Sequence, residues 1–254
     1  MSLIDLFRLD GRVVVVTGAS SGLGVGFAQS LAESGADIVL AARRVDRLAH
    51  TQKLVEAEGR RAVAVGVDVA NPSDCQGVVA TAMDEFGRVD ALVNNAGVGT
   101  AVHATEETPE QFQQVINVNL NGSYWMAQAC AKVMKPGSSI VNLSSILGLT
   151  SLGLPQAAYS SSKAAIIGLT RDLAQQWTGR RGIRVNALAP GYFQSEMTDQ
   201  MDADFVAKKV IARTLVNRLG YPDEINAALL FLLSDASGYI TGVTLPIDGG
   251  LLTN

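Results

Sequence analysis

Seven short apolar segments rich in β-branched residues recur along the chain, and segments with helical spacing lie between them. The apolar segments are residues 13–17, 37–42, 62–67, 90–93, 139–143, 183–188 and 243–247. They show little alternation of polar and apolar side chains, which is typical of strands covered on both faces. A parallel sheet held between two layers of helices covers its strands in this way.

Helical patterns fill the intervals between these segments. Leu23, Phe27 and Leu31 recur every four residues, and longer apolar stripes run over residues 112–134 and 158–177. The regular alternation of strand and helix implies right-handed crossovers. We therefore predict an α/β protein with a three-layer αβα doubly wound parallel sheet of about seven strands, the Rossmann fold.

The composition favours a single domain over residues 1–254. Hydrophobic residues make up 48% of the chain and charged residues 17%, and no linker, charge block or repeat divides it. Residues 98–108 and 192–216 fit the alternation poorly, and both follow the carboxyl end of a predicted strand, where open α/β sheets bind ligands. We predict that residues 192–216 form a mobile lid over the substrate; an ordinary packed helix pair is the alternative. The apolar side chains of this segment include Met197, Met201 and Phe205.

Charge and cysteine usage exclude several classes of function. The net charge of −4 gives no reason to expect binding to nucleic acid or an anionic membrane, and no apolar stretch is long enough to span a bilayer. Cys75 and Cys130 stand alone and are expected to be reduced thiols. His50 and His103 lack metal-ligand partners, so no metal is predicted. Residues 1–5 have no secretory pattern, and we expect a cytoplasmic protein with a small-molecule substrate.

A glycine-rich turn joins the first predicted strand to the first predicted helix. Its spacing, G-x-x-x-G-x-G over residues 18–24, allows a tight turn and lets the helix N-terminus present free N–H groups to a pyrophosphate. A plain glycine-rich turn is the alternative. No Gly-Lys-Ser/Thr follows, which argues against an NTP-hydrolysing loop. The predicted cofactor contacts in this loop are Gly18, Ser20, Ser21, Gly22, Leu23 and Gly24.

The end of the second predicted strand bears on the choice of dinucleotide. Ala42 stands where an acidic residue would bind the free 2′-hydroxyl of NAD, and Arg43 and Arg44 follow it. Guanidinium groups pair well with a phosphate, so we predict a preference for NADP(H), with NAD(H) as the second option. Solvated arginines at a helix start are the alternative. Asp68, at the end of the third strand, is placed to meet an adenine amino group; an aspartate in a surface turn is the alternative.

Tyr159 and Lys163 lie four residues apart on a predicted helix and therefore share one face. A neighbouring ammonium favours the phenolate, so the pair suits acid–base chemistry. Ser145 lies just after the fifth strand, where a hydroxyl can donate to a carbonyl oxygen that gains negative charge; Ser144 competes for this role on spacing alone. Asn119 is a polar residue inside a long predicted helix.

Taken together, five motifs resemble the classical short-chain dehydrogenases/reductases from about residue 10 to the end of the chain. They are T-G-x-x-x-G-x-G at 17–24, N-N-A-G at 94–97, Y-x-x-x-K at 159–163, P-G at 190–191 and D-G-G at 248–250. The overall likeness is to bacterial 3-oxoacyl reductases and to sugar or polyol dehydrogenases of that family.

The resemblance implies a role for each matching residue. Tyr159 would be the general acid/base, Lys163 would lower its pKa and hold the nicotinamide ribose, and Ser145 would polarise the substrate carbonyl. Asn119 would anchor a water chain to the lysine, with Asn117 as the weaker candidate. The remaining cofactor contacts would come from Asp68, Val69, Asn95, Ala96, Gly97, Pro190, Gly191, Phe193 and Ser195.

The implied activity is hydride transfer between a nicotinamide cofactor and a ketone or secondary alcohol. One rival is a dinucleotide-sensing regulator without chemistry, and another is an epimerase or dehydratase that keeps NAD(H) bound. A carrier-protein substrate is doubtful because the turn 135–138 is nearly bare of charge. Relatives are commonly homotetramers, and residues 158–169 could supply such a surface here or could equally be part of the core. A homodimer is the smaller alternative.

Overall fold

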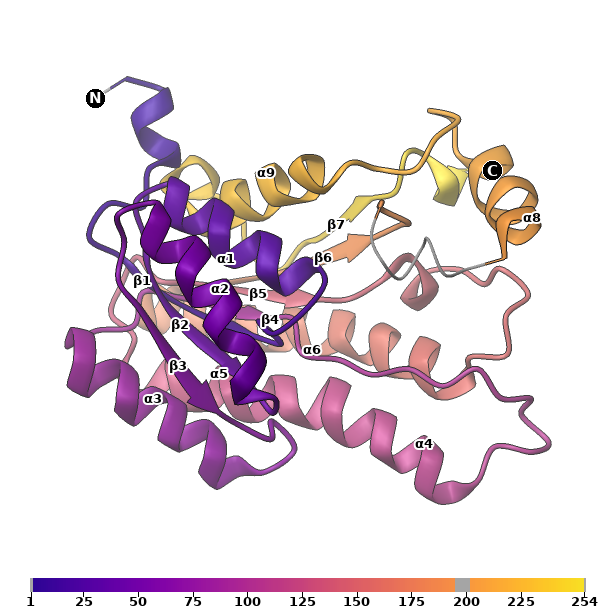
Figure 1. The fold of residues 1–254 in the computed structure, drawn as a ribbon, viewed down its shortest axis with the longest axis horizontal. Coiled ribbons are helices and arrows are strands. Elements are labelled where there is room, and N and C mark those ends of the chain that lie inside the picture. The colour runs from indigo at the N-terminus through magenta and orange to yellow at the C-terminus, as the bar shows by residue number, and fades with distance from the viewer. Residues whose placement is uncertain (1, 195–201, 254) are drawn as a thin grey trace.

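Seven parallel strands form one sheet in the order β3-β2-β1-β4-β5-β6-β7 (Figure 1). The computed structural model describes residues 2–194 and 202–253. The strands are β1 Val13–Thr17, β2 Asp37–Ala42, β3 Ala62–Gly66, β4 Ala91–Asn94, β5 Ser139–Leu143, β6 Arg184–Pro190 and β7 Thr244–Ile247. The strand order reverses its direction between β1 and β4, so their carboxyl ends open a crevice at the centre of the sheet. The predicted doubly wound parallel sheet is confirmed.

Helices cover both faces of this sheet. They are α1 Leu23–Glu33, α2 Val45–Ala57, α3 Pro72–Phe86, α4 Pro109–Ile116, α5 Gly122–Val133, α6 Ala157–Arg181, α8 Ala203–Phe205 and α9 Pro222–Leu233. Helices α1, α2 and α9 pack on one face, and α3, α5 and α6 on the other. Among the described residues, no helix has both the length and the apolar character needed to cross a membrane.

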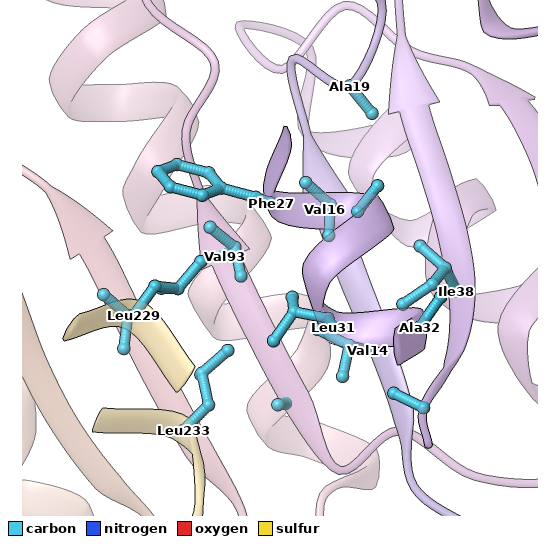
Figure 2. Close-up of a cluster of buried hydrophobic side chains, with 14 of the residues drawn as sticks. Val14, Val16, Ala19, Phe27, Leu31, Ala32, Ile38, Val93, Leu229 and Leu233 are labelled. Carbon is cyan, nitrogen blue, oxygen red and sulfur yellow. The ribbon is translucent and has the colours of Figure 1, made fainter. Parts of the chain in front are cut away.

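The central strand β1 explains the absence of polar alternation in the sequence. All five of its residues are buried. Val14 and Val16 enter the core under α1 and α9, whereas Val13 and Val15 enter the core under α3 and α5. Figure 2 shows the first of these cores, where Phe27 of α1 packs among side chains from the sheet and from α9.

The predicted helix over residues 112–134 contains an irregular turn. Between α4 and α5 the chain forms a π-helical segment, η2, over Asn117–Asn121. The Ser123 hydroxyl donates to the carbonyl oxygen of Asn119, one turn earlier in the helix, at 2.7 Å. A π turn inserts an extra residue without a matching apolar signal, so the periodic pattern could not reveal it. The bulge places Asn119 at the buried side of the helix, 1% exposed.

Within the described part of the segment 192–216, residues 203–213 are helical. They comprise α8, a π-helical turn over Val206–Val210 and a 3-10 turn over Ile211–Arg213. At the far end of the segment the Leu215 amide donates to the Gly249 carbonyl oxygen at 2.8 Å, which ties the segment to the chain after β7. Met197 and Met201 lie outside the described residues, and the lid remains a prediction.

The core under α1 gives a direct test of the fold. We expect Phe27→Ala to lower the free energy of unfolding by about 3–5 kcal/mol, because the fully buried ring would leave a cavity. Urea unfolding followed by circular dichroism measures this loss. The control is Phe112→Ala on α4, whose side chain is 38% exposed and whose loss should be much smaller. Equal losses in the two variants would contradict the packing described here.

Candidate active site

The glycine-rich loop lies at the carboxyl end of β1, where its backbone turns sharply into α1. Gly18 has a φ of +68° and Gly22 a φ of +57°, both in the region that favours glycine. A methyl group on Gly24 would overlap the Gly18 carbonyl oxygen, so the first turn of α1 packs directly on the loop. A methyl group on Gly22 would meet no atom within 4 Å. The loop is therefore closely packed at Gly24 and open at Gly22, and a phosphate-binding turn requires such open space beside its backbone.

A pocket of about 610 Å³ adjoins this loop at the ends of β2 and β3. It is lined by Arg43, Asp68, Ala70, Pro109, Glu110, Gln113, Gln114, Asn117 and Val118. Arg44 donates to the Ser21 hydroxyl at 3.1 Å and so joins the glycine-rich loop to the same region. Ala42 is buried, and no carboxylate takes its place at the end of β2. The pocket suits the adenosine end of a dinucleotide.

The N-N-A-G motif braces the loop from the neighbouring strand β4. The Thr17 hydroxyl accepts from the Asn95 and Ala96 amides, each at 3.0 Å. The Asn95 side chain donates to the Thr17 carbonyl oxygen at 2.9 Å and to that of Gly18 at 3.3 Å. These three donors therefore hold the loop in place. Gly97, predicted with Asn95 and Ala96 for the ribose side, is exposed beside them.

Tyr159, Ser145 and Lys163 come together where β5 ends against α6. The Tyr159 phenol forms a hydrogen bond with the Ser145 hydroxyl, and the Lys163 ammonium lies 5.6 Å from the centre of the Tyr159 ring. Lys163 also donates to the Leu143 carbonyl oxygen at 2.6 Å. The rival Ser144 donates to the Lys163 carbonyl oxygen at 2.7 Å and is turned into the protein. Geometry thus separates two serines that spacing could not.

The pKa values of this group follow from burial. Burial raises the pKa of the Tyr159 phenol above its ordinary value, and the hydrogen bond with Ser145 offsets part of the rise. The sequence predicts a lowered pKa because of Lys163, and the structure differs. Burial also lowers the pKa of Lys163 to about 8. The Lys163 ammonium, which is expected to stabilise the phenolate, is thus itself poorly solvated. It donates its hydrogen bond to the Leu143 carbonyl oxygen.

Asn119 reaches the same site from the π turn. Its side-chain oxygen accepts from the Val98 amide at 2.8 Å, and its side-chain nitrogen donates to the Ser162 hydroxyl at 2.9 Å. Ser162 in turn donates to the Tyr159 carbonyl oxygen at 2.7 Å. A methyl group on Gly97 would stand 3.4 Å from the Asn119 oxygen and 3.6 Å from the Lys163 ammonium, so both groups face that glycine.

The competing Asn117 lies elsewhere. Its side-chain oxygen accepts from Gln113 at 2.8 Å and from Asn121 at 3.0 Å, on the side of the helix that lines the adenosine pocket. Ser162 is a contact that sequence reasoning missed, because a serine inside Tyr-Ser-Ser-Ser-Lys gives no signal that distinguishes it from its neighbours.

The nicotinamide end is predicted near the carboxyl end of β6. Pro190 ends the strand, and Gly191 packs closely on Asp248, where a methyl group would stand 2.8 Å from the Asp248 Cα. Phe193 is buried, pairs with Gly220 in an isolated bridge and covers that glycine with its ring. Ser195 lies outside the described residues. At the other end of the sheet, Val69 is buried against Gly122, and Asp68 accepts from the Ala70 amide at 3.1 Å.

Comparison with known proteins agrees with this geometry. A family model of short-chain dehydrogenases, described as enoyl-(acyl carrier protein) reductase, matches residues 18–252. The chain belongs to the short-chain dehydrogenases/reductases. It is 36% identical to 2-dehydro-3-deoxy-D-gluconate 5-dehydrogenase of Dickeya dadantii, over 98% of this chain and 99% of that protein. It is 40% identical to galactitol 2-dehydrogenase (L-tagatose-forming) of Cereibacter sphaeroides, over 98% of each.

A solved structure is similarly close. A short-chain dehydrogenase of Burkholderia cenocepacia in complex with NADP has a TM-score of 0.90 and 33% identity, covering 96% of this chain and 99% of that one. This short-chain dehydrogenase/reductase is therefore an NAD(P)(H)-dependent oxidoreductase that transfers hydride between the cofactor and a ketone or secondary alcohol. The relatives favour this activity over the non-catalytic regulator. Within the described ranges 2–194 and 202–253, no group of His, Cys, Asp and Glu is placed to hold a metal ion.

The buried ammonium leads to a prediction about stability. Since one pKa unit corresponds to about 1.4 kcal/mol, a pKa of about 8 means that burial of Lys163 costs the ligand-free fold about 3 kcal/mol below pH 8. We expect Lys163→Met to raise the free energy of unfolding by about 1–2 kcal/mol at pH 7, the rest being offset by the unpaired Leu143 carbonyl oxygen. Urea unfolding of both chains measures the gain.

The sign of the pH dependence provides a second check. The folded pKa of Lys163 lies below its ordinary value, so the natural chain gains stability as the pH rises from about 8 towards that value. The advantage of the variant must shrink over this range. Lys132→Met, at an exposed position of α5, serves as the control and should change little at any pH. An advantage of Lys163→Met that is independent of pH would contradict the assignment.

Proposed function

We propose that this enzyme interconverts a secondary alcohol and a ketone on a polyhydroxylated substrate, a sugar, sugar acid or polyol, with NADP(H) as the preferred cofactor. The observation that carries the redox chemistry is the joint placement of Ser145, Tyr159 and Lys163 at the crevice edge. Identity to the gluconate-type and galactitol dehydrogenases supports the substrate class. The nearly uncharged turn 135–138 argues against an acidic carrier protein as partner.

The residues at the crevice fit a bound dinucleotide. The open loop at Gly22, the pocket beside Arg43 and the space over Gly97 would receive its pyrophosphate, adenosine and ribose parts in turn. When bound, the cofactor supplies the hydride acceptor or donor. The side chains orient the substrate, stabilise charge on its oxygen and move the accompanying proton.

The proton is assigned to the Tyr159 hydroxyl. Its raised pKa keeps the phenol protonated at neutral pH, which is the state that donates to a carbonyl oxygen during reduction. Ser145 would donate a second hydrogen bond to that oxygen and stabilise the charge that develops on it. Lys163 and a water held near Asn119 would return a proton to the phenol afterwards. Lys163 would also hold the ribose.

The first test of this assignment is Tyr159→Phe. We expect kcat to fall by about 10²–10⁴-fold, because the variant has no group to transfer the proton, while the dissociation constant for NADPH stays within about twofold. Absorbance of the reduced cofactor measures turnover, and its fluorescence measures binding. The control is Tyr239→Phe, which removes a fully exposed hydroxyl. Unchanged turnover in Tyr159→Phe would refute the assignment.

Substrate conversion by the natural chain without net change in cofactor absorbance would support the epimerase alternative.

The second test concerns the cofactor. A guanidinium that binds the 2′-phosphate contributes a charge-assisted hydrogen bond, so Arg43→Asp should lower the ratio of kcat/KM for NADPH over NADH by about 10–100-fold. Arg47→Asp makes the same charge change at an exposed position in the first turn of α2 and controls for long-range electrostatics. Equal effects of the two variants, or none, would show that Arg43 does not bind the phosphate.

The assembly and location of the enzyme also belong to the proposal. We propose a cytoplasmic homotetramer, or a homodimer, built from a single domain with a lid over residues 192–216. The two buried, unpaired thiols of Cys75 and Cys130 are consistent with a reducing compartment. Small residues on α6 support a flat association surface, since a methyl group on Gly168 would meet no atom within 4 Å.

A further inference from the structure

A small apolar cluster packs against Tyr159. It consists of Ile146, Leu147, Leu152, Val210 and Leu251, and two tyrosine rings, those of Tyr159 and Tyr192, pack against it. Tyr192 lies two residues after the end of β6. Burial raises the pKa of the Tyr192 phenol, and the proximity of Tyr159 adds to the rise. A second phenol therefore stands beside the proposed catalytic one.

The Tyr192 hydroxyl has no hydrogen-bond partner among the residues that the structure describes. Its ring is half-buried against the cluster, and its edge also lines a smaller pocket of about 170 Å³ with Phe193 and Val216. A phenol in such surroundings normally finds a partner for its O–H group. The position of this hydroxyl, next to the reacting centre, makes a bound substrate the natural partner.

Gln156 supplies a second unpaired group one turn before Tyr159. It immediately precedes α6, and its side-chain oxygen Oε1 is buried without a hydrogen bond. Among the described residues only one other buried side-chain atom lacks a partner, the Arg60 Nε, and Arg60 is bound to Asp37 through another nitrogen. Buried amide oxygens are nearly always paired, so this oxygen is available to accept a hydrogen bond from a bound molecule.

We propose that Tyr192 and Gln156 are specificity-determining residues that bind hydroxyl groups of the substrate beside the reacting carbon. An amide oxygen only accepts, so Gln156 requires a donor, and a phenol can both donate and accept. A polyhydroxylated chain offers such groups on the carbons flanking the carbonyl. An unsubstituted alkyl or acyl chain would leave both polar groups unpaired and would be rejected for that reason. This inference rests on the proposed function and names the residues that select its substrate class.

The experiment compares two substrates of equal chain length in the oxidative direction, galactitol and 2-hexanol, with NADP as cofactor. Tyr192→Phe removes only the hydroxyl, and Gln156→Met removes only the amide at similar volume. Each should lower kcat/KM for galactitol by about tenfold. Each should leave kcat/KM for 2-hexanol unchanged or raise it, because the alkyl chain no longer leaves that polar group unpaired. Tyr159→Phe is the comparison that should abolish both reactions. Thermal unfolding of each variant should match that of the natural chain.

The outcomes separate this inference from the proposed function. If the natural chain oxidises 2-hexanol but not galactitol, gluconate or L-rhamnose, the proposed substrate class fails and the inference fails with it. If the natural chain oxidises one of these hydroxylated substrates, that substrate replaces galactitol and the proposed function stands. In that case equal losses on both substrates, or no loss on either, overturn the roles of Tyr192 and Gln156 alone.

Discussion

The contact between the end of β5 and the middle of α6 determines the geometry of the whole active site. Lys163 donates to the Leu143 carbonyl oxygen, and Ser144 donates back to the Lys163 carbonyl oxygen. Gly148 permits this approach, because a methyl group there would stand 2.7 Å from the Lys163 carbonyl carbon. One strand end and one helix are thereby fixed against each other at close range. The distance between Ser145, just past the strand, and Tyr159, on the helix, follows from that contact.

A network of buried amides extends the same rigidity into the sheet. Asn94 donates to the Asn142 side-chain oxygen at 2.9 Å, and Asn142 donates to the Thr170 hydroxyl at 3.0 Å, so β4, β5 and α6 are linked side chain to side chain. All three residues are buried, and paired groups in such surroundings hold their neighbours in a single arrangement. The cofactor loop, braced by Thr17 and Asn95, and the catalytic group therefore belong to one connected frame.

The sequence was sufficient for the fold because burial on both faces leaves a strong signal. The uniform apolar runs at 13–17 and 139–143 coincide with β1 and β5. Local sequence patterns were insufficient where the position of a single residue determines the helix type or the catalytic side chain. The π turn at Asn117–Asn121 keeps the apolar stripe unbroken, so nothing in the spacing marks it. Spacing does not distinguish Ser144 from Ser145. In the folded chain the Ser144 hydroxyl donates to the Lys163 carbonyl oxygen, whereas the Ser145 hydroxyl bonds to the Tyr159 phenol.

Charge environments were harder still to predict. The spacing of Tyr159 and Lys163 identified the pair but gave the wrong direction for the pKa of the phenol, because i,i+4 spacing says nothing about how deeply both groups are buried. The same limit applies to Gln156 and Tyr192. Their residue types are ordinary, and only the absence of partners in the folded chain makes them notable.

These poorly satisfied groups lie together, and their location has a thermodynamic consequence. Lys163 is buried as an ammonium with one acceptor, Gln156 has a buried oxygen with none, and the Tyr192 phenol stands without a partner among the described residues. Elsewhere, buried polar residues such as Asn142 and Arg184 are paired several times over. A ligand that completes the missing bonds stabilises the folded state by mass action. A ligand bound at the crevice is therefore expected to raise the free energy of unfolding.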